Sequence, residues 1–107
     1  MKLFLDTANV DEMRKALEWG VLDGITTNPS LLAKEGREFH QVIREITSLV
    51  PGPVSVEVLA TDAEGMVSQG REFASISSNV VVKIPMGTEG LKATKRLAAE
   101  DIPVNMT

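Results

Sequence analysis

The sequence predicts an α/β fold in which five parallel β-strands alternate with helices. Short aliphatic runs such as VVVKI (Val80–Ile84) recur along the chain, and the segments between them place apolar residues three and four positions apart. Strict alternation of the two patterns favours a parallel sheet with right-handed crossovers. The 107 residues, 43% hydrophobic and 24% charged, suffice for one globular core.

The first part of the chain predicts two strands separated by a helix. Lys2–Asp6 is predicted as a strand, and Val10–Trp19 as a helix that ends just before Gly20. Val21–Thr27 is predicted as the second strand, which Asn28-Pro29 ends. The apolar face of the helix carries Val10, Met13 and Leu17.

A second helix and the third strand follow. One apolar stripe predicts the helix, and Pro51-Gly52 ends it. Val54–Val58 is the third strand, because its valines alternate with polar residues. The stripe consists of Phe39, Val42, Ile43, Ile46, Leu49 and Val50.

The last part predicts two more helices and two more strands. The spacing of TDAE (Thr61–Glu64) predicts a capping box that opens a helix. Val80–Ile84, ended by Pro85, is the fourth strand, a helix starts at Thr88, and Ile102–Thr107 is the fifth strand. The residues expected to face inward are Met66, Val67, Gly70, Phe73 and Ala74 in the first of these helices, and Leu91, Thr94, Leu97 and Ala98 in the second.

Two architectures fit this order of elements. One is a five-stranded doubly wound domain, complete at this length. The other is the first half of an eight-stranded barrel, which as a whole needs about 250 residues.

Composition excludes several functional classes. A net charge of −4 argues against binding to nucleic acid, and the basic residues Lys92, Lys95 and Arg96 are expected on a solvated helix face. The absence of cysteine excludes disulfides and thiolate chemistry. A single histidine, His40, cannot build a zinc site and is expected as a surface residue. The apolar run in MKLFLDT is too short for a signal peptide or membrane span, so we expect a cytoplasmic protein.

Every predicted strand carries a polar residue near its carboxyl end, on the face opposite its aliphatic residues. Each has an ordinary structural explanation: a lysine guards an edge strand, an aspartate caps a helix, and Asn-Pro makes a turn. Because they all fall on the same side, we expect a shared polar site at the carboxyl edge of the sheet. These residues are Asp6, Thr26, Asn28, Glu57, Lys83, Asn105 and Thr107.

Lys83 suggests the chemistry of such a site. Desolvation favours a neutral amine, which attacks carbonyl carbons and forms Schiff bases. The iminium then accepts electrons from a neighbouring carbon–carbon bond, provided that a base removes a hydroxyl proton. Asp6 and Glu57 are suitable acid–base groups, although a carboxylate close to Lys83 would also stabilise the ammonium form. No metal or organic cofactor is required.

The chain resembles the transaldolase family, and in particular its small bacterial and archaeal members, which include fructose-6-phosphate aldolase. The motifs that carry the resemblance are LFLDTAN, DGITTNPSLLAKEG, VSVEV, EGM, VVVKIPM, EGLKA and VNMT. The resemblance implies a parallel (β/α) barrel of TIM type, here only its first half, with four βα units and a fifth strand. Residues 1–107 would then form the N-terminal half of a single barrel domain.

The resemblance also implies an activity. Family members transfer a dihydroxyacetone unit from a ketose phosphate to an aldose phosphate, a reaction of the pentose phosphate pathway. The Schiff-base lysine matches Lys83, and the base that takes the C4 hydroxyl proton matches Asp6. The glutamate that works through a water in carbinolamine dehydration matches Glu57, and the threonine of that relay matches Thr107.

Three further residues match the family's substrate-binding positions. Asn28 and Asn105 match asparagines that hold the dihydroxyacetone hydroxyls, and Thr26 matches a residue lining the same pocket. Aldolase-type members carry glutamine at the position of Glu57, so the carboxylate favours transaldolase over fructose-6-phosphate aldolase activity. The segment PMGT departs slightly from the commoner PMT of the family.

Family members are about twice as long as this chain, and their later strands supply the groups that hold the substrate phosphate. We therefore expect sugar phosphates as substrates, and either a homo-oligomer or pairing with a missing C-terminal half. One alternative is a half barrel that self-associates without catalysis. The other is a phosphoacceptor receiver module, but there the lysine follows the threonine, whereas Lys83 precedes Thr107.

Overall fold

The computed structural model describes all residues from 1 to 107 and contains one parallel sheet of five strands. Each predicted strand is present; Val80–Ile84 has the predicted bounds, and the other four strands are shorter than predicted. None of the helices has both the length and the apolar composition to cross a membrane. The elements are β1 (Phe4–Asp6), α1 (Val10–Glu18), β2 (Gly24–Thr26), α2 (Pro29–Lys34), α3 (Phe39–Leu49), β3 (Val54–Glu57), α4 (Ala63–Ala74), β4 (Val80–Ile84), α5 (Thr88–Ala99) and β5 (Val104–Met106).

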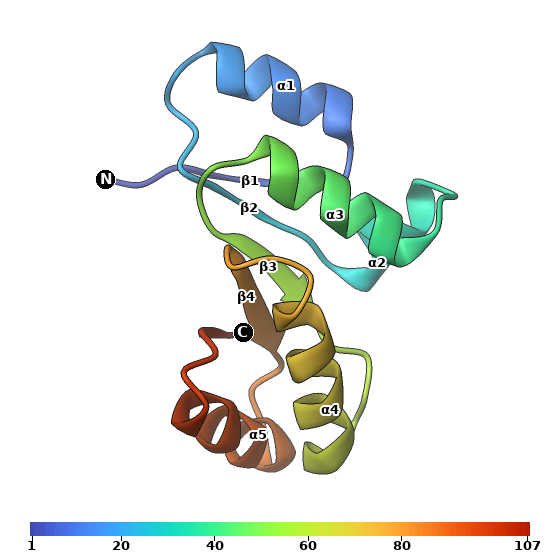
Figure 1. Ribbon diagram of the computed structural model, residues 1–107, viewed down its shortest axis with the longest axis vertical. Helices are drawn as coiled ribbons and strands as arrows, with labels where there is room; N and C mark the ends of the chain where they lie inside the picture. Colours follow the sequence, from blue (N-terminus) through green and yellow to red (C-terminus); the bar gives the residue numbers. More distant parts are fainter.

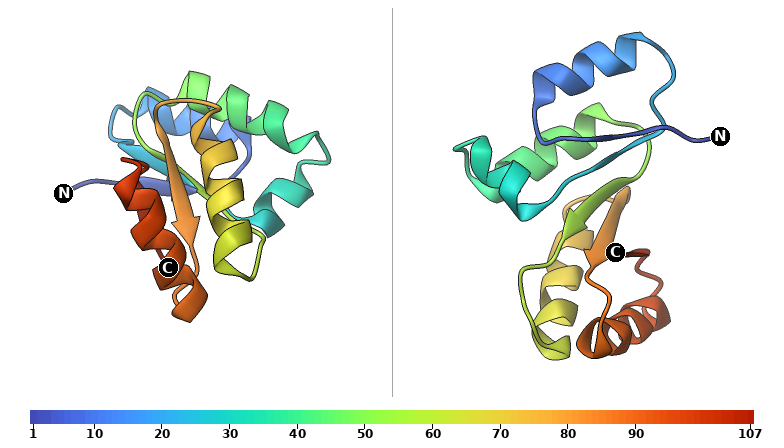
Figure 2. Two further views of the ribbon diagram at one scale, coloured as in Figure 1. Left: turned by 60° about the horizontal axis from the view of Figure 1, so that its bottom comes forward. Right: turned by 180° about the vertical axis from the view of Figure 1, so that it is seen from behind.

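The order of the strands decides between the two predicted architectures. The strands lie side by side in chain order, β1-β2-β3-β4-β5. A doubly wound sheet reverses its order at a switch point, whereas this sheet advances one strand at a time in one direction, as in a (β/α) barrel. Figures 1 and 2 show α1 and α3 next to β1 and β2, and α4 and α5 next to β4. The predicted first half of a TIM-type barrel is therefore confirmed.

The core lies between the sheet and its helices. In β4, Val80, Val82 and Ile84 are fully buried, while Val81 and Lys83 on the opposite face are half-buried. The two-residue period of the sequence therefore predicted the faces of this strand correctly. The opposite face is the inner face of the barrel, and it is partly open to solvent, with Phe4 44% exposed.

The helix α2 was not predicted. Asn28 accepts a hydrogen bond from the backbone N–H of Leu31 through its side-chain oxygen (3.0 Å), and Pro29 occupies the first helical turn. Asparagine at the N-cap followed by proline is a helix-start signal, so the sequence contained the information. The strand-ending turn predicted at Asn28-Pro29 is therefore the start of a helix.

The predicted capping box at Thr61–Glu64 is wrong. The N-cap of α4 is Asp62, and its side chain makes no capping hydrogen bond. Instead, Glu89 of α5 accepts a hydrogen bond from the backbone N–H of Ala63 (3.1 Å). A tertiary contact between neighbouring helices thus replaces the local cap.

The predicted inward face of α5 is only partly correct. Leu97 is buried, but Leu91 is 55% exposed, Ala98 is exposed and Thr94 is half-buried. The buried face instead consists of Gly90, Ala93 and Leu97. The helix turns this face towards α4, where a Cβ added at Gly70 would lie only 2.8 Å from Leu97 Cδ1.

His40 lies at the molecular surface, as expected, but its ring contacts two carboxylates. Its ring is half-buried, with Nδ1 3.1 Å from Glu38 Oε1 and Nε2 2.6 Å from Glu72 Oε1. It also packs edge-to-face against Phe39. The side chain therefore joins the start of α3 to α4.

Glu38 caps α3, and we expect this cap to make stability depend on pH. The backbone N–H groups of Gln41 and His40 donate to its carboxylate (2.8 and 3.1 Å), which lowers the pKa of Glu38 from its ordinary value of 4.5. A lowered pKa in the folded state means that the stabilisation is present above the ordinary carboxyl range and is lost as the pH falls through the folded-state value.

Glu38→Gln removes the titration but keeps a capping oxygen. We expect its thermal unfolding midpoint to fall less than that of the unmodified protein between pH 7 and the acid range below about pH 5. Glu18→Gln, which changes an exposed carboxylate without a partner, is the matched control. Equal acid sensitivity in both variants would contradict the expected role of Glu38.

Candidate active site on the inner face of the sheet

The register of the strands arranges the predicted site residues in two rows across the inner face. In one row Asp6 on β1 pairs with Thr26 on β2, and Thr26 pairs with Ser55 on β3. In the other row, nearer the carboxyl edge, Glu57 on β3 pairs with Lys83 on β4, and Lys83 with Asn105 on β5. Neighbouring strands lie about 4.8 Å apart, so each residue is next to its partner in the row.

The first row contains a short hydrogen bond. The Thr26 hydroxyl donates to Asp6 Oδ1 at 2.9 Å, which fixes one carboxylate oxygen of a largely exposed side chain. The other carboxylate oxygen accepts no hydrogen bond from the protein. Asp6 therefore has a defined orientation and a free oxygen that faces the inner side of the sheet.

Lys83 lies at the centre of the second row. Its side chain is half-buried, less than the burial the sequence suggested, because no element of these 107 residues covers the inner face. Nζ donates to the backbone oxygen of Thr27 at 3.4 Å. Lys83 forms no ion pair, whereas Lys92 pairs with Glu89 at 2.9 Å on the outer side. Neither Asp6 nor Glu57 contacts the amine directly.

The side-chain amides of Asn28 and Asn105 each use one of their two polar atoms in a hydrogen bond within the protein. The side-chain oxygen of Asn28 caps α2, which leaves its amide nitrogen free to donate. Asn105 Nδ2 lies 3.4 Å from Ser55 Oγ, and the Asn105 side-chain oxygen makes no hydrogen bond within the protein. Two residues after Asn105, Thr107 is paired to β4 through its backbone N–H, which donates to Ile84 at 2.9 Å, and its side chain is exposed.

The structure brings some of the predicted residues together and keeps others apart. Glu57, Lys83 and Asn105 are direct neighbours, and Asp6 contacts Thr26. Asp6 is three strands away from Lys83, a path of about 14 Å along the sheet. The two groups therefore face a shared space rather than each other, and only a ligand of several atoms could contact both.

An open groove lies near the carboxyl edge of the sheet, but none of the residues of the second row lines it. It measures about 430 Å³ and lies between the loops that follow β3 and β4. Gln69 on α4 holds the first of these loops, because its side-chain oxygen accepts the backbone N–H groups of Leu59 and Ala60 (2.8 and 2.9 Å). No sequence signal indicated Gln69, which lies ten residues along the chain from Leu59.

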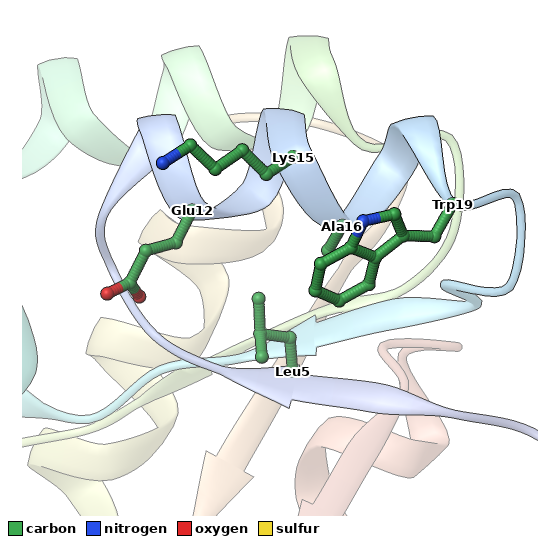
Figure 3. A pocket seen from close by; sticks show the side chains of 5 residues that line it. All are labelled: Leu5, Glu12, Lys15, Ala16 and Trp19. Atoms are coloured by element: carbon green, nitrogen blue, oxygen red, sulfur yellow. The ribbon is translucent and has the colours of Figure 1, made fainter.

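A second cavity lies outside the site. It measures about 350 Å³ and lies between β1 and α1. Figure 3 shows Leu5 pointing from β1 towards α1, next to Ala16 and Trp19. Leu5 and Asp6 point to opposite faces of the strand, so this cavity is on the helix side and has no access to Lys83.

Metal binding finds no support in the side chains. No group of three or more histidine, aspartate or glutamate residues is arranged to hold a metal ion, and the chain has no cysteine. The chemistry available at the inner face is that of an amine, two carboxylates, two amides and several hydroxyl groups.

Comparison with known proteins finds matches along nearly the whole chain. Residues 3–107 match the sequence model of the transaldolase/fructose-6-phosphate aldolase family. A probable transaldolase of Clostridium acetobutylicum is 63% identical over 107 residues, which is all of this chain and 50% of the relative. Probable transaldolases of Aquifex aeolicus (60%, 49% of the relative) and Agathobacter rectalis (62%, 50% of the relative) also match along the whole chain. The chain thus spans about half the length of the curated relatives it matches.

Proposed function

The chain belongs to the transaldolase/fructose-6-phosphate aldolase family, and on this premise we propose that Lys83 forms a Schiff base in the transfer of a dihydroxyacetone unit between sugar phosphates. The donor is a ketose phosphate and the acceptor an aldose phosphate. The observation that supports the proposal best is the row in which Glu57 and Asn105 flank Lys83 at the carboxyl edge of the sheet. In barrels of this type, that edge carries the active site.

The first half of the proposed reaction forms the iminium. Neutral Lys83 Nζ attacks the ketose carbonyl carbon, and the carbonyl oxygen gains a proton to give a carbinolamine. Loss of water then gives the iminium. Glu57, on the neighbouring strand, supplies and recovers protons through a water in this dehydration, and Thr107 belongs to the same relay.

The second half breaks and remakes a carbon–carbon bond. Asp6 removes the proton of the C4 hydroxyl, the C3–C4 bond breaks, and its electrons move into the iminium to give an enamine on Lys83. The aldose phosphate leaves, and the enamine attacks the carbonyl carbon of a second aldose phosphate, whose oxygen takes the proton back from Asp6. Water then hydrolyses the resulting iminium, which releases the new ketose phosphate and frees the amine of Lys83. Asn28 and Asn105 hold the hydroxyls of the bound three-carbon unit, since each has an amide end free to bind a ligand.

The first test is covalent capture of the donor. The 107-residue chain is incubated with dihydroxyacetone, reduced with borohydride and digested for mass spectrometry. The proposal requires an adduct on Lys83 and little on the exposed lysines such as Lys95. Labelling of many lysines or of none would overturn the proposal. Release of free dihydroxyacetone from fructose 6-phosphate without an acceptor would favour aldolase over transaldolase activity.

Asp6 allows the two halves of the reaction to be separated. We expect Asp6→Asn to lower the rate of carbon–carbon bond cleavage about 100-fold, while capture of dihydroxyacetone on Lys83 continues. Asparagine keeps the shape and can still accept a hydrogen bond from Thr26, but it cannot take a proton. Stopped-flow measurement of aldose phosphate release, in this chain fused to the remaining half of the Clostridium acetobutylicum relative, checks the first effect, and borohydride capture checks the second. Parallel loss of both would contradict a role confined to cleavage.

We further propose that transfer requires additional protein to cover the inner face of the sheet. Phe4, Asp6 and Thr107 are exposed, and the edges of β1 and β5 are unpaired in this sheet, so water enters the site freely. We expect the 107 residues alone to show little or no transfer. Addition of the remaining half of the Clostridium acetobutylicum relative, as a separate or a fused chain, should restore it. Full transfer by the 107 residues alone, measured with sedoheptulose 7-phosphate as donor, would contradict this expectation.

A further inference from the structure

Thr27 is the one residue whose main chain contacts the amine of Lys83. It directly follows β2, and its backbone oxygen lies 3.4 Å from Nζ. Pairing between β2 and β3 stops just before this oxygen, since the last bond runs from the Thr27 N–H to Ser55 O (3.0 Å). No backbone N–H donates to Thr27 O. Within the protein, Lys83 Nζ is therefore the one donor to this carbonyl oxygen.

The hydroxyl of Thr27 fixes the position of this carbonyl. Thr27 is fully buried, and its hydroxyl donates to the same Ser55 oxygen at 2.7 Å. Two hydrogen bonds thus anchor one residue to one acceptor on β3. A buried hydroxyl with a short bond fixes the backbone that carries it, because breaking the bond would leave a polar group without a partner.

We infer that Thr27 is a positioning residue for the Schiff-base step, a role that rests on the proposed function of Lys83. When the neutral amine donates an N–H to Thr27 O, the lone pair of Nζ points away from this oxygen and towards the inner face. The iminium formed later keeps one N–H on the same nitrogen and bears positive charge, which the carbonyl dipole stabilises. A distance of 3.4 Å is long for a hydrogen bond, but such contacts often shorten when the substrate binds.

A single substitution separates this role from simple packing. Thr27→Val replaces the hydroxyl with a methyl group of similar size. A methyl carbon stays about 3.3–3.6 Å from a carbonyl oxygen, well beyond the 2.7 Å of the present hydroxyl contact. The end of β2 therefore moves away from Ser55, and the carbonyl of Thr27 moves with it. Thr27→Ser keeps the hydroxyl and should behave like the unmodified protein.

Thr47→Val is the matched control. Thr47 is also buried, and its hydroxyl donates to the carbonyl of Ile43 at 2.8 Å, one turn earlier in α3. The substitution thus removes a buried hydroxyl of the same kind on the helix side of the sheet. Any effect that comes only from loss of stability should appear in both valine variants, and their thermal unfolding midpoints measure that loss.

Two measurements on the 107-residue chain test the inference. The first is the rate constant for borohydride capture of dihydroxyacetone on Lys83, which we expect to fall roughly three- to tenfold in Thr27→Val. It should stay unchanged in Thr47→Val and recover in Thr27→Ser. The second is the NMR resonance of the Lys83 side chain in lysine-labelled protein, assigned with Lys83→Arg. This resonance should move in Thr27→Val and not in Thr47→Val.

The two measurements distinguish the failure of this inference from that of the proposed function. If the unmodified chain gives no adduct on Lys83, the proposed function fails, and the NMR comparison still decides whether Thr27 positions the amine. If the unmodified chain is captured and the two valine variants behave alike in both measurements, the role of Thr27 is overturned. A fall in the capture rate of Thr27→Ser equal to that of Thr27→Val would overturn it as well.

Discussion

Replacing Lys83 with arginine should abolish covalent capture of dihydroxyacetone and lower transfer of the three-carbon unit by at least about 1000-fold. Arginine keeps the positive charge and most of the length of lysine, but it is not deprotonated in proteins and cannot form the iminium. Because Lys83 makes no ion pair, the substitution breaks no charge pair within the chain. The expected loss is therefore chemical rather than structural.

Transfer is best measured in this chain fused to the remaining half of the Clostridium acetobutylicum relative. Lys95→Arg is the matched control, since Lys95 is an exposed lysine of α5 and should retain full activity. The unfolding midpoints of the two variants should agree within a few degrees. Capture of dihydroxyacetone at another lysine, with transfer retained in Lys83→Arg, would show that the nucleophile has been assigned wrongly.

The sequence could predict the faces of the strands but not their order. Alternation of Val54 and Val56 with Ser55 and Glu57 defines a buried and a polar face whatever the neighbours of the strand. A doubly wound sheet and a barrel share this pattern, because both bury one face of each strand under helices. Only the order β1-β2-β3-β4-β5 distinguishes them, and that order depends on contacts across the whole chain.

The sequence could predict that the residues of the candidate site share one face of the sheet, but not the contacts between them. The prediction that the polar residues share the inner face depends only on strand period and direction. The pairing of Glu57 with Lys83 depends on the register between β3 and β4, which no local pattern in either strand indicates. The contact between Lys83 and Thr27 joins residues 56 positions apart, and no local pattern indicates it.

The errors in the helices have the same origin. Local signals predicted a capping box before α4, but the backbone N–H of Ala63 donates its hydrogen bond to Glu89 of the neighbouring helix. Apolar periodicity placed Leu91 inward, but the small residues Gly90 and Ala93 allow α5 to approach the sheet on another face. In both cases a tertiary contact outweighed a local preference of about 1 kcal/mol or less.

A substitution at Gly90 should have a large effect on stability. It lies in the first turn of α5, and a Cβ added there would lie 2.0 Å from the backbone oxygen of Pro85 and 3.1 Å from Ile84 Cγ2. Neither atom belongs to a flexible chain end, since Pro85 O is backbone and Ile84 is fully buried. We expect Gly90→Ala to lower the free energy of unfolding by about 3 kcal/mol, a large fraction of what a domain of this size has.

Gly87 provides a control within the same loop. A Cβ at Gly87 would meet no atom within 4 Å, and its φ of 164° is an extended conformation open to any residue. Gly87→Ala should therefore leave stability unchanged or raise it slightly, because alanine restricts the unfolded chain. Urea denaturation followed by circular dichroism compares Gly90→Ala with Gly87→Ala. Equal midpoints would contradict the prediction, because they would show that the backbone near Pro85 moves to accommodate the added Cβ at little cost.

The consequence of Gly90→Ala for function follows from the position of Pro85. Pro85 lies two residues after Lys83, and the next residue, Met86, donates its backbone N–H to the carbonyl of Thr107 (2.6 Å). A shift of Pro85 away from α5 therefore moves the end of β4 against β5, and with it Lys83 and Thr107. We expect Gly90→Ala to reduce borohydride capture on Lys83 even at low temperature, where the variant remains folded. Normal capture in the folded variant would contradict this expectation, because it would show that the loop after β4 does not determine the position of the Lys83 amine.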